Sequence, residues 1–122
     1  MPRNRRFQLA FGMAATFAFV MATLPHPPEI PWHPEDKIQH ITAFVVLTVL
    51  AIPAFPRVRP LHIALSLSAF GGLIEIVQAI PALHRDSDWL DWLADSVAIL
   101  GALGVTSLLR RLLSARAIGS RA

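Results

Sequence analysis

Four long apolar segments, separated by short polar connections, dominate the chain. They cover residues 7–24, 38–55, 61–80 and 92–109. Each reaches the roughly 17–25 predominantly apolar residues that a helix needs to cross a lipid bilayer. None shows the sustained alternation of apolar and polar residues that is typical of strands, and alanine, leucine and glycine are frequent in them. The pattern therefore predicts an all-α, polytopic membrane protein with four transmembrane helices.

Composition supports the same class. The chain has 122 residues, of which 54% are hydrophobic and 16% are charged, whereas soluble domains usually carry about 25% charged residues. This length fits a single domain. The chain has no cysteine, which excludes disulfides and thiolate metal sites. Its net charge of +3 does not come from one basic tract, so we expect no nucleic-acid partner.

Basic and acidic residues fall in different connections. Apart from Lys37 and Arg85, every lysine and arginine lies before the first segment, between the second and third, or after the fourth. The other two connections, with their flanks, hold most of the acids and all three tryptophans: Glu29, Trp32, Glu35, Asp36, Asp86, Asp88, Trp89, Asp91 and Trp92. Cytoplasmic loops carry an excess of lysine and arginine, and tryptophans are enriched at the membrane interfaces. The chain is therefore expected to have both ends in the cytoplasm, with basic segments 1–6 and 110–122 flanking one membrane domain, 7–109.

Two other interpretations of these segments remain open. A basic start followed by an apolar core is also typical of a cleaved signal peptide. The apolar core of segment 7–24 is longer than a usual signal core, and no clear cleavage motif of small residues precedes Pro25. A soluble helical bundle is the second alternative, but its helices normally show a polar face and segment 7–24 shows none.

Polar side chains interrupt three segments at helical spacing. Residues three or four apart share one helix face. The faces comprise Asp36, Lys37 and His40; Ser68, Gly71, Gly72, Glu75 and Gln78; and Asp91, Asp95, Ala98 and Ala102. Ionisable groups within membrane helices are costly, usually paired and often functional. We therefore predict a polar pocket at the outer end of the bundle, formed by the following residues: His40, Glu75, Gln78, Asp91 and Asp95, with Lys37 and Arg85 at its mouth.

These groups suggest chemistry at the outer membrane surface. His40 with Glu75 or Asp91 is a candidate for general acid–base catalysis. Lys37 and Arg85 are suited to hold an anionic group, such as a lipid phosphate or a peptide carboxylate, and Gln78 and Asp95 are further candidate binding residues. We predict neither a metal nor a cofactor, because a metal site of His40, Glu75 and Asp91 would lack the usual local histidine spacing.

The same residues also have structural interpretations. Asp88 near a helix start favours the positive end of the helix dipole, with Ser87 or Asp86 as the cap. Gln78 is also suited to a hydrogen bond between helices, and the two basic residues at the mouth are also suited to ion pairs. The alternative function is therefore a non-catalytic interaction or structural module, whose polar cluster locks the helix packing. Catalysis and the oligomeric state stay open.

The ordered polar set resembles the VanZ-like family of small bacterial membrane proteins. It comprises Asp36-Lys37-x-x-His40, Glu75-x-x-Gln78, Arg85, Asp91 and Asp95 on successive segments, and the resemblance runs from about residue 36 to 104. It implies an all-helical domain in the bacterial inner membrane. Because some family members are associated with resistance to glycopeptide antibiotics such as teicoplanin, it also implies a role at the cell envelope. The chain departs from the family pattern at Ala98, where a glycine is common.

Overall fold

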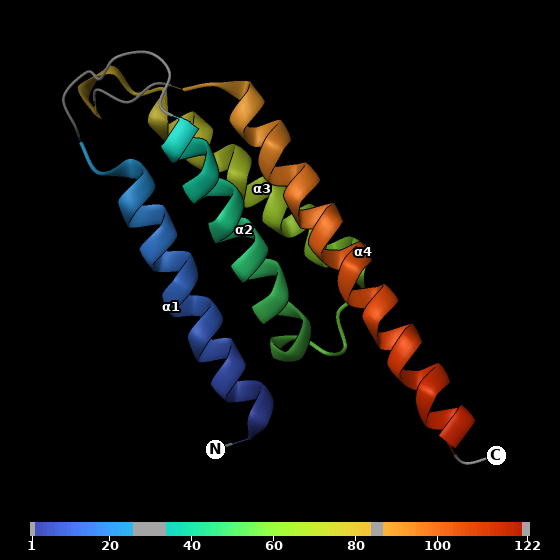
Figure 1. Ribbon diagram of the computed structural model, residues 1–122. Coiled ribbons are helices and arrows are strands. Elements are labelled where there is room, and N and C mark those ends of the chain that lie inside the picture. The colour runs from blue at the N-terminus through green and yellow to red at the C-terminus, as the bar shows by residue number, and fades with distance from the viewer. Residues whose placement is uncertain (1, 26–33, 84–86, 121–122) are drawn as a thin grey trace.

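Four long helices form the protein, as a computed structural model that describes residues 2–25, 34–83 and 87–120 shows. They are α1 (Arg3–Thr23), α2 (Pro34–Ala54), α3 (Pro60–Gln78) and α4 (Trp89–Ser120), with a short 3₁₀ helix η1 (Pro81–Leu83) after α3. The described residues contain no β-strand, so the all-α prediction is confirmed. Successive helices run in opposite directions (Figure 1). We call the end with both termini and the α2–α3 connection the terminal end, and the opposite end the loop end.

Helix α2 lies at the centre of the bundle. Its buried residues Phe44, Leu47, Ala51 and Ala54 recur every three or four positions, which places them on one continuous face. Helix α1 packs on one side of α2 and α4 packs on another, while α3 packs mainly against α4 (Figure 1). The polar residues on α2 and α4 are therefore brought face to face.

The outer surface of the bundle is apolar. Large hydrophobic side chains such as Met13, Phe17 and Ile76 are exposed. Such a surface suits lipid, because the hydrocarbon of a bilayer is as apolar as leucine. All four helices are long and apolar enough to cross a membrane. The predicted class, a membrane protein with four candidate spanning helices, is therefore supported by both length and surface.

The helix ends differ from the predicted segments at several points. Helix α2 begins at Pro34 rather than at residue 38, and proline suits the first turn of a helix because its missing N–H has no helical partner there. Helix α4 runs from Trp89 to Ser120 rather than from 92 to 109. The basic segment predicted as a separate tail thus continues the helix, since it is rich in arginine, leucine and alanine, which are strong helix formers.

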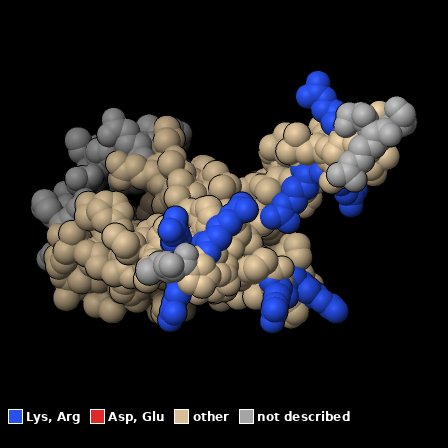
Figure 2. Space-filling view, turned by 90° about the horizontal axis from the view of Figure 1, so that it is seen from below, with Lys and Arg blue, Asp and Glu red and all other residues tan. Residues whose placement is uncertain are grey.

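The two ends of the bundle differ in charge. In the view onto the terminal end (Figure 2), basic side chains project from the surface and no acidic side chain is visible. The described lysines and arginines other than Lys37 are Arg3, Arg5, Arg6, Arg57, Arg59, Arg110, Arg111 and Arg116. They sit on the helix ends and the connection that form this end (Figure 1). The charge asymmetry predicted from the sequence is thus matched by the arrangement of the helices.

Helix α3 approaches its neighbours most closely at Gly71. A Cβ atom there would lie 3.3 Å from Cζ of Phe44 and 3.4 Å from Oδ2 of Asp95. We expect Gly71→Leu to lower the free energy of unfolding by about 1–3 kcal/mol, because extra carbons would overpack this junction. Gly101→Leu is the matched control, since a Cβ at Gly101 meets nothing within 4 Å. Unfolding midpoints in detergent measure the difference, and equal midpoints for the two variants would contradict this packing.

Candidate functional site

Two charge pairs connect α2 to α4 at the loop end. Nζ of Lys37 lies 3.7 Å from Oδ1 of Asp91. One helical turn deeper, Nδ1 of His40 lies 3.9 Å from Oδ2 of Asp95. The spacing of three residues on α2 and four on α4 keeps each pair on the facing sides of the two helices. We call these two contacts the α2–α4 pairs.

Exposure falls steeply along the α2–α4 pairs. The side chain of Lys37 is 47% exposed and that of Asp91 is 20% exposed. His40 is 17% exposed and Asp95 only 1%. The polar groups thus lead from the surface at Lys37 to a fully enclosed carboxylate. His40, which is partly exposed, lies between Lys37 at the surface and Asp95 in the interior.

The carboxylate of Asp95 is buried, and few polar groups surround it. Within the described residues, neither of its carboxylate oxygens has a hydrogen-bond partner. A buried carboxylate is very costly unless it is paired, and its described partner is His40. Gly71 provides the space on the α3 side, because a Cβ there would come within 3.4 Å of Oδ2. The glycine and the histidine together allow an acid at this position.

The carboxylate of Glu75 does not belong to the α2–α4 pairs and instead accepts a hydrogen bond from the backbone. Its Oε2 accepts a hydrogen bond from the backbone N–H of Asp88 at 3.0 Å, and Ser87 Oγ donates to the Glu75 carbonyl oxygen at 3.0 Å. Oδ1 of Asp88 in turn accepts the N–H of Leu90, which makes Asp88 the N-cap of α4. Of the two residues predicted as caps, Ser87 therefore binds Glu75 instead, and Asp86 lies outside the described residues. Glu75 fixes the start of α4.

Gln78 ties α3 to α1. Its Nε2 donates to the carbonyl oxygen of Ala22 at 2.8 Å. Carbonyls in the last turn of a helix lack a helical partner, so this bond satisfies one of them. Gln8 of α1 does the same at the terminal end, where it donates to the carbonyl of Ala54 at 2.9 Å. Gln8 was absent from the predicted polar set, which was taken from the other three segments.

A further set of bonds joins α3 to α4 beside the α2–α4 pairs. Trp92 Nε1 donates to the carbonyl oxygen of Ser68 at 3.0 Å. The hydroxyls of Ser68 and Ser96 lie 2.9 Å apart. The sequence indicated Ser68 on the polar face of its segment but did not indicate Ser96. This contact helps to hold Asp95, the neighbour of Ser96, at the centre of three helices.

The predicted cluster is thus assembled in part. Lys37, His40, Asp91 and Asp95 come together in the α2–α4 pairs, whereas Glu75 binds the start of α4. Gln78 points to α1 instead. Arg85 lies outside the described residues. Among those residues no group of three or more acidic or histidine side chains is placed to hold a metal ion, which gives the metal alternative no support.

Comparison of the chain with protein-family models, with curated proteins and with solved structures finds no match. The resemblance to the VanZ-like family therefore stays a prediction that rests on the residues quoted for it. The fold and the site define a broader class: a four-helix membrane protein with buried ionisable groups at one end of its bundle.

The hydrogen bond from Asp88 predicts how Glu75 variants behave. Glu75→Leu removes the acceptor for a part-buried N–H group, and an unmade bond of this kind costs about 1–3 kcal/mol. Glu75→Gln keeps a carbonyl oxygen in the same place, so its unfolding midpoint should stay close to that of the unmodified protein. Unfolding in detergent compares the two variants. An equally large loss for both would show that the charge, and not the acceptor, stabilises this end.

Proposed function

We propose that this chain is an integral protein of the bacterial cytoplasmic membrane, related to the VanZ-like family, that binds or acts on a polar component of the cell envelope. The observation that carries the proposal is the position of His40: it is partly exposed, and it contacts the fully buried carboxylate of Asp95. A histidine held by a buried acid is a common arrangement for proton transfer. His40 is the group that would exchange a proton, and Asp95 is the residue that positions it.

We propose Asp95, rather than Glu75 or Asp91, as the acid that acts with His40. Asp91 pairs with Lys37, and Glu75 accepts the N–H of Asp88, so Asp95 is the carboxylate best placed to orient the imidazole. Because Nδ1 faces Asp95, Nε2 is the nitrogen available to a bound molecule. Lys37 at the surface suits an anionic group of that molecule, such as a lipid phosphate or a peptide carboxylate.

The proposed orientation places this site outside the cytoplasm. Basic residues favour the cytoplasmic side of a membrane, and the described arginines gather at the terminal end. The loop end, with the α2–α4 pairs, would then face the cell envelope. That side suits the role at the cell envelope that the family resemblance implies.

A structural module is the second candidate. It is favoured by Glu75 and Gln78, whose hydrogen bonds join parts of this chain to one another. In that case the α2–α4 pairs would serve only to hold the helices together. The two candidate functions predict different effects of removing the Asp95 charge, both on the amount of protein in the membrane and on cell survival.

The test uses variants that preserve shape. Asp95→Asn removes the charge and leaves a neutral imidazole beside it, whereas His40→Gln keeps an N–H donor near Asp95 but cannot exchange protons. We expect both to reach the membrane in normal amounts, and to lower survival under a teicoplanin-type antibiotic to that of cells without the chain. Gln39→Ala, at an exposed neighbour of His40, is the matched control and should keep full survival.

Three outcomes would contradict the proposal. Full survival with both variants at normal abundance would exclude a functional role for His40 and Asp95. Loss of both proteins from the membrane would favour the structural module. If the unmodified chain gave cells no added survival, the role at the cell envelope would be wrong.

A further inference from the structure

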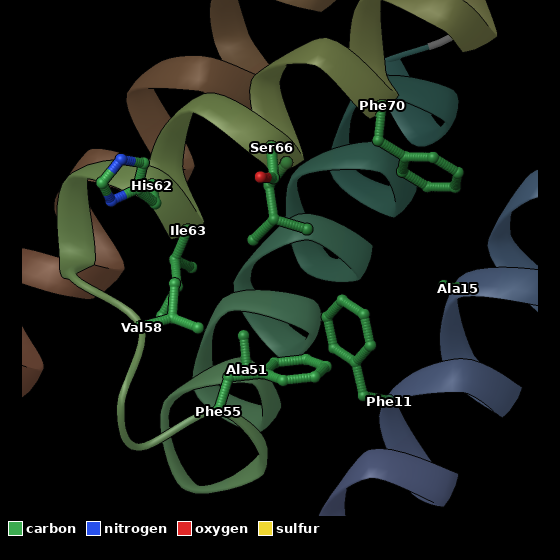
Figure 3. A pocket seen from close by; sticks show the side chains of 10 residues that line it. Phe11, Ala15, Ala51, Phe55, Val58, His62, Ile63, Ser66 and Phe70 are labelled. Carbon is green, nitrogen blue, oxygen red and sulfur yellow. The ribbon is translucent and has the colours of Figure 1, made fainter.

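An apolar groove lies between α1, α2 and α3 at the terminal end. The α2–α4 pairs lie at the opposite end of the helices. The volume of the groove is about 390 Å³. It is lined by Phe11 and Ala15 of α1, by Phe55 after α2, and by Val58, Ile63 and Phe70 (Figure 3). From His62 to Phe70 the groove follows α3 for about 12 Å, at 1.5 Å per residue. The groove is partly open to the apolar outer surface of the bundle, so in a bilayer an apolar chain is suited to fill it.

Within the described residues, a hydrogen bond and a ring contact join α1 to α3 on the loop-end side of the groove. Near the loop end, Gln78 donates to the carbonyl of Ala22, and the rings of Phe19 and Phe70 lie 6.2 Å apart. Towards the terminal end the ring of Phe11 instead packs edge-on against Phe55, at 5.4 Å. Helix α1 thus follows α2 there, and the side of α3 that faces α1 is left uncovered.

The connection between α2 and α3, which contributes Val58 to the lining of the groove, is basic. Arg57 and Arg59 flank Val58, which lines the groove, and the described residues show no ion pair for either arginine. Arg59 is also the N-cap residue of α3, where no side chain caps the helix, so the positive end of the helix dipole adds to their charge. The described acidic residues that could compete lie at the loop end. An occupant with an apolar chain and an anionic head is complementary to both parts.

We propose that this groove binds an anionic phospholipid, with one acyl chain against Phe11, Phe55 and Phe70 and the phosphate at Arg57 and Arg59. Basic pockets between membrane helices are a known form of lipid recognition. The acyl chain replaces the missing contact between α1 and α3, and the phosphate is held where the α2–α3 connection meets the membrane surface. The site is separate from His40 and Asp95, so it does not depend on the function proposed for them.

Native mass spectrometry of the full chain in detergent tests the site with two added lipids of equal chain length, phosphatidylglycerol and phosphatidylcholine. We expect one phosphatidylglycerol to bind preferentially. The double variant Arg57→Gln/Arg59→Gln should bind it roughly 30-fold more weakly, from about tenfold for each 1.4 kcal/mol and about 1 kcal/mol for each arginine. Ala15→Leu, which fills the groove, should also reduce binding, whereas Ala10→Leu at an exposed site on α1 should not.

The matched charge control is Arg111→Gln/Arg116→Gln, which removes two arginines from α4 at the same end without touching the groove. This variant should retain phosphatidylglycerol. Equal loss in both double variants would show attraction to a generally basic surface and would overturn the site. Equal binding of the two lipids to the unmodified chain would overturn it as well, whatever the outcome for His40 and Asp95.

Discussion

A carboxylate enclosed in an apolar helix bundle is the constraint around which this structure is arranged. Asp95 is 1% exposed and lies in a helix whose next turns carry the buried Ile99 and Leu103. Burying such a group requires a nearby partner and enough space for its oxygens. His40 supplies the partner from α2 and Gly71 supplies the space from α3. Three helices thus meet at one ionisable group, and a change in any of them alters its surroundings.

Much of this architecture could be predicted from the sequence. The four helices were predicted from apolar segments that contain few or no charged residues. A helix that crosses a bilayer needs such a segment, and few other structures do. The joining of Lys37, His40, Asp91 and Asp95 at one end also followed from helical spacing. Some connections are rich in basic residues and the others in acidic residues, so the two ends of the bundle could be distinguished from the sequence alone.

The exact partners could not be predicted, because spacing gives the face of a helix and not its neighbour. Acid–base chemistry of His40 with Glu75 or Asp91 stays a prediction, and the acid that pairs with His40 in the described residues is Asp95. The fourth segment was expected to continue its polar face through Ala98 and Ala102; these two are half-buried, and their neighbours Ile99 and Leu103 are buried. The two faces differ by one residue around α4, and the packing of α4 against α2 and α3 decides which face is buried more deeply.

The hydrogen bond that holds the start of α4 could not be predicted from the sequence either. Glu75 accepts an N–H from the residue before the helix, Asp88, and backbone groups of this kind leave no mark in a residue pattern. The end of α4 at Ser120 was missed for another reason: arginines that indicate a membrane boundary are also good helix formers. A charge cluster therefore locates the membrane surface better than it locates the end of a helix.

The coupling between His40 and Asp95 tests the central claim most directly, and a double-mutant cycle measures it. His40→Leu should cost about 3–5 kcal/mol of unfolding free energy, because it leaves the buried carboxylate unpaired. His40→Leu/Asp95→Leu should recover most of that loss, since the double variant also removes the carboxylate that His40→Leu leaves unpaired. Unfolding in detergent provides the free energies. A double variant no more stable than His40→Leu would contradict the pairing on which this account of the structure depends.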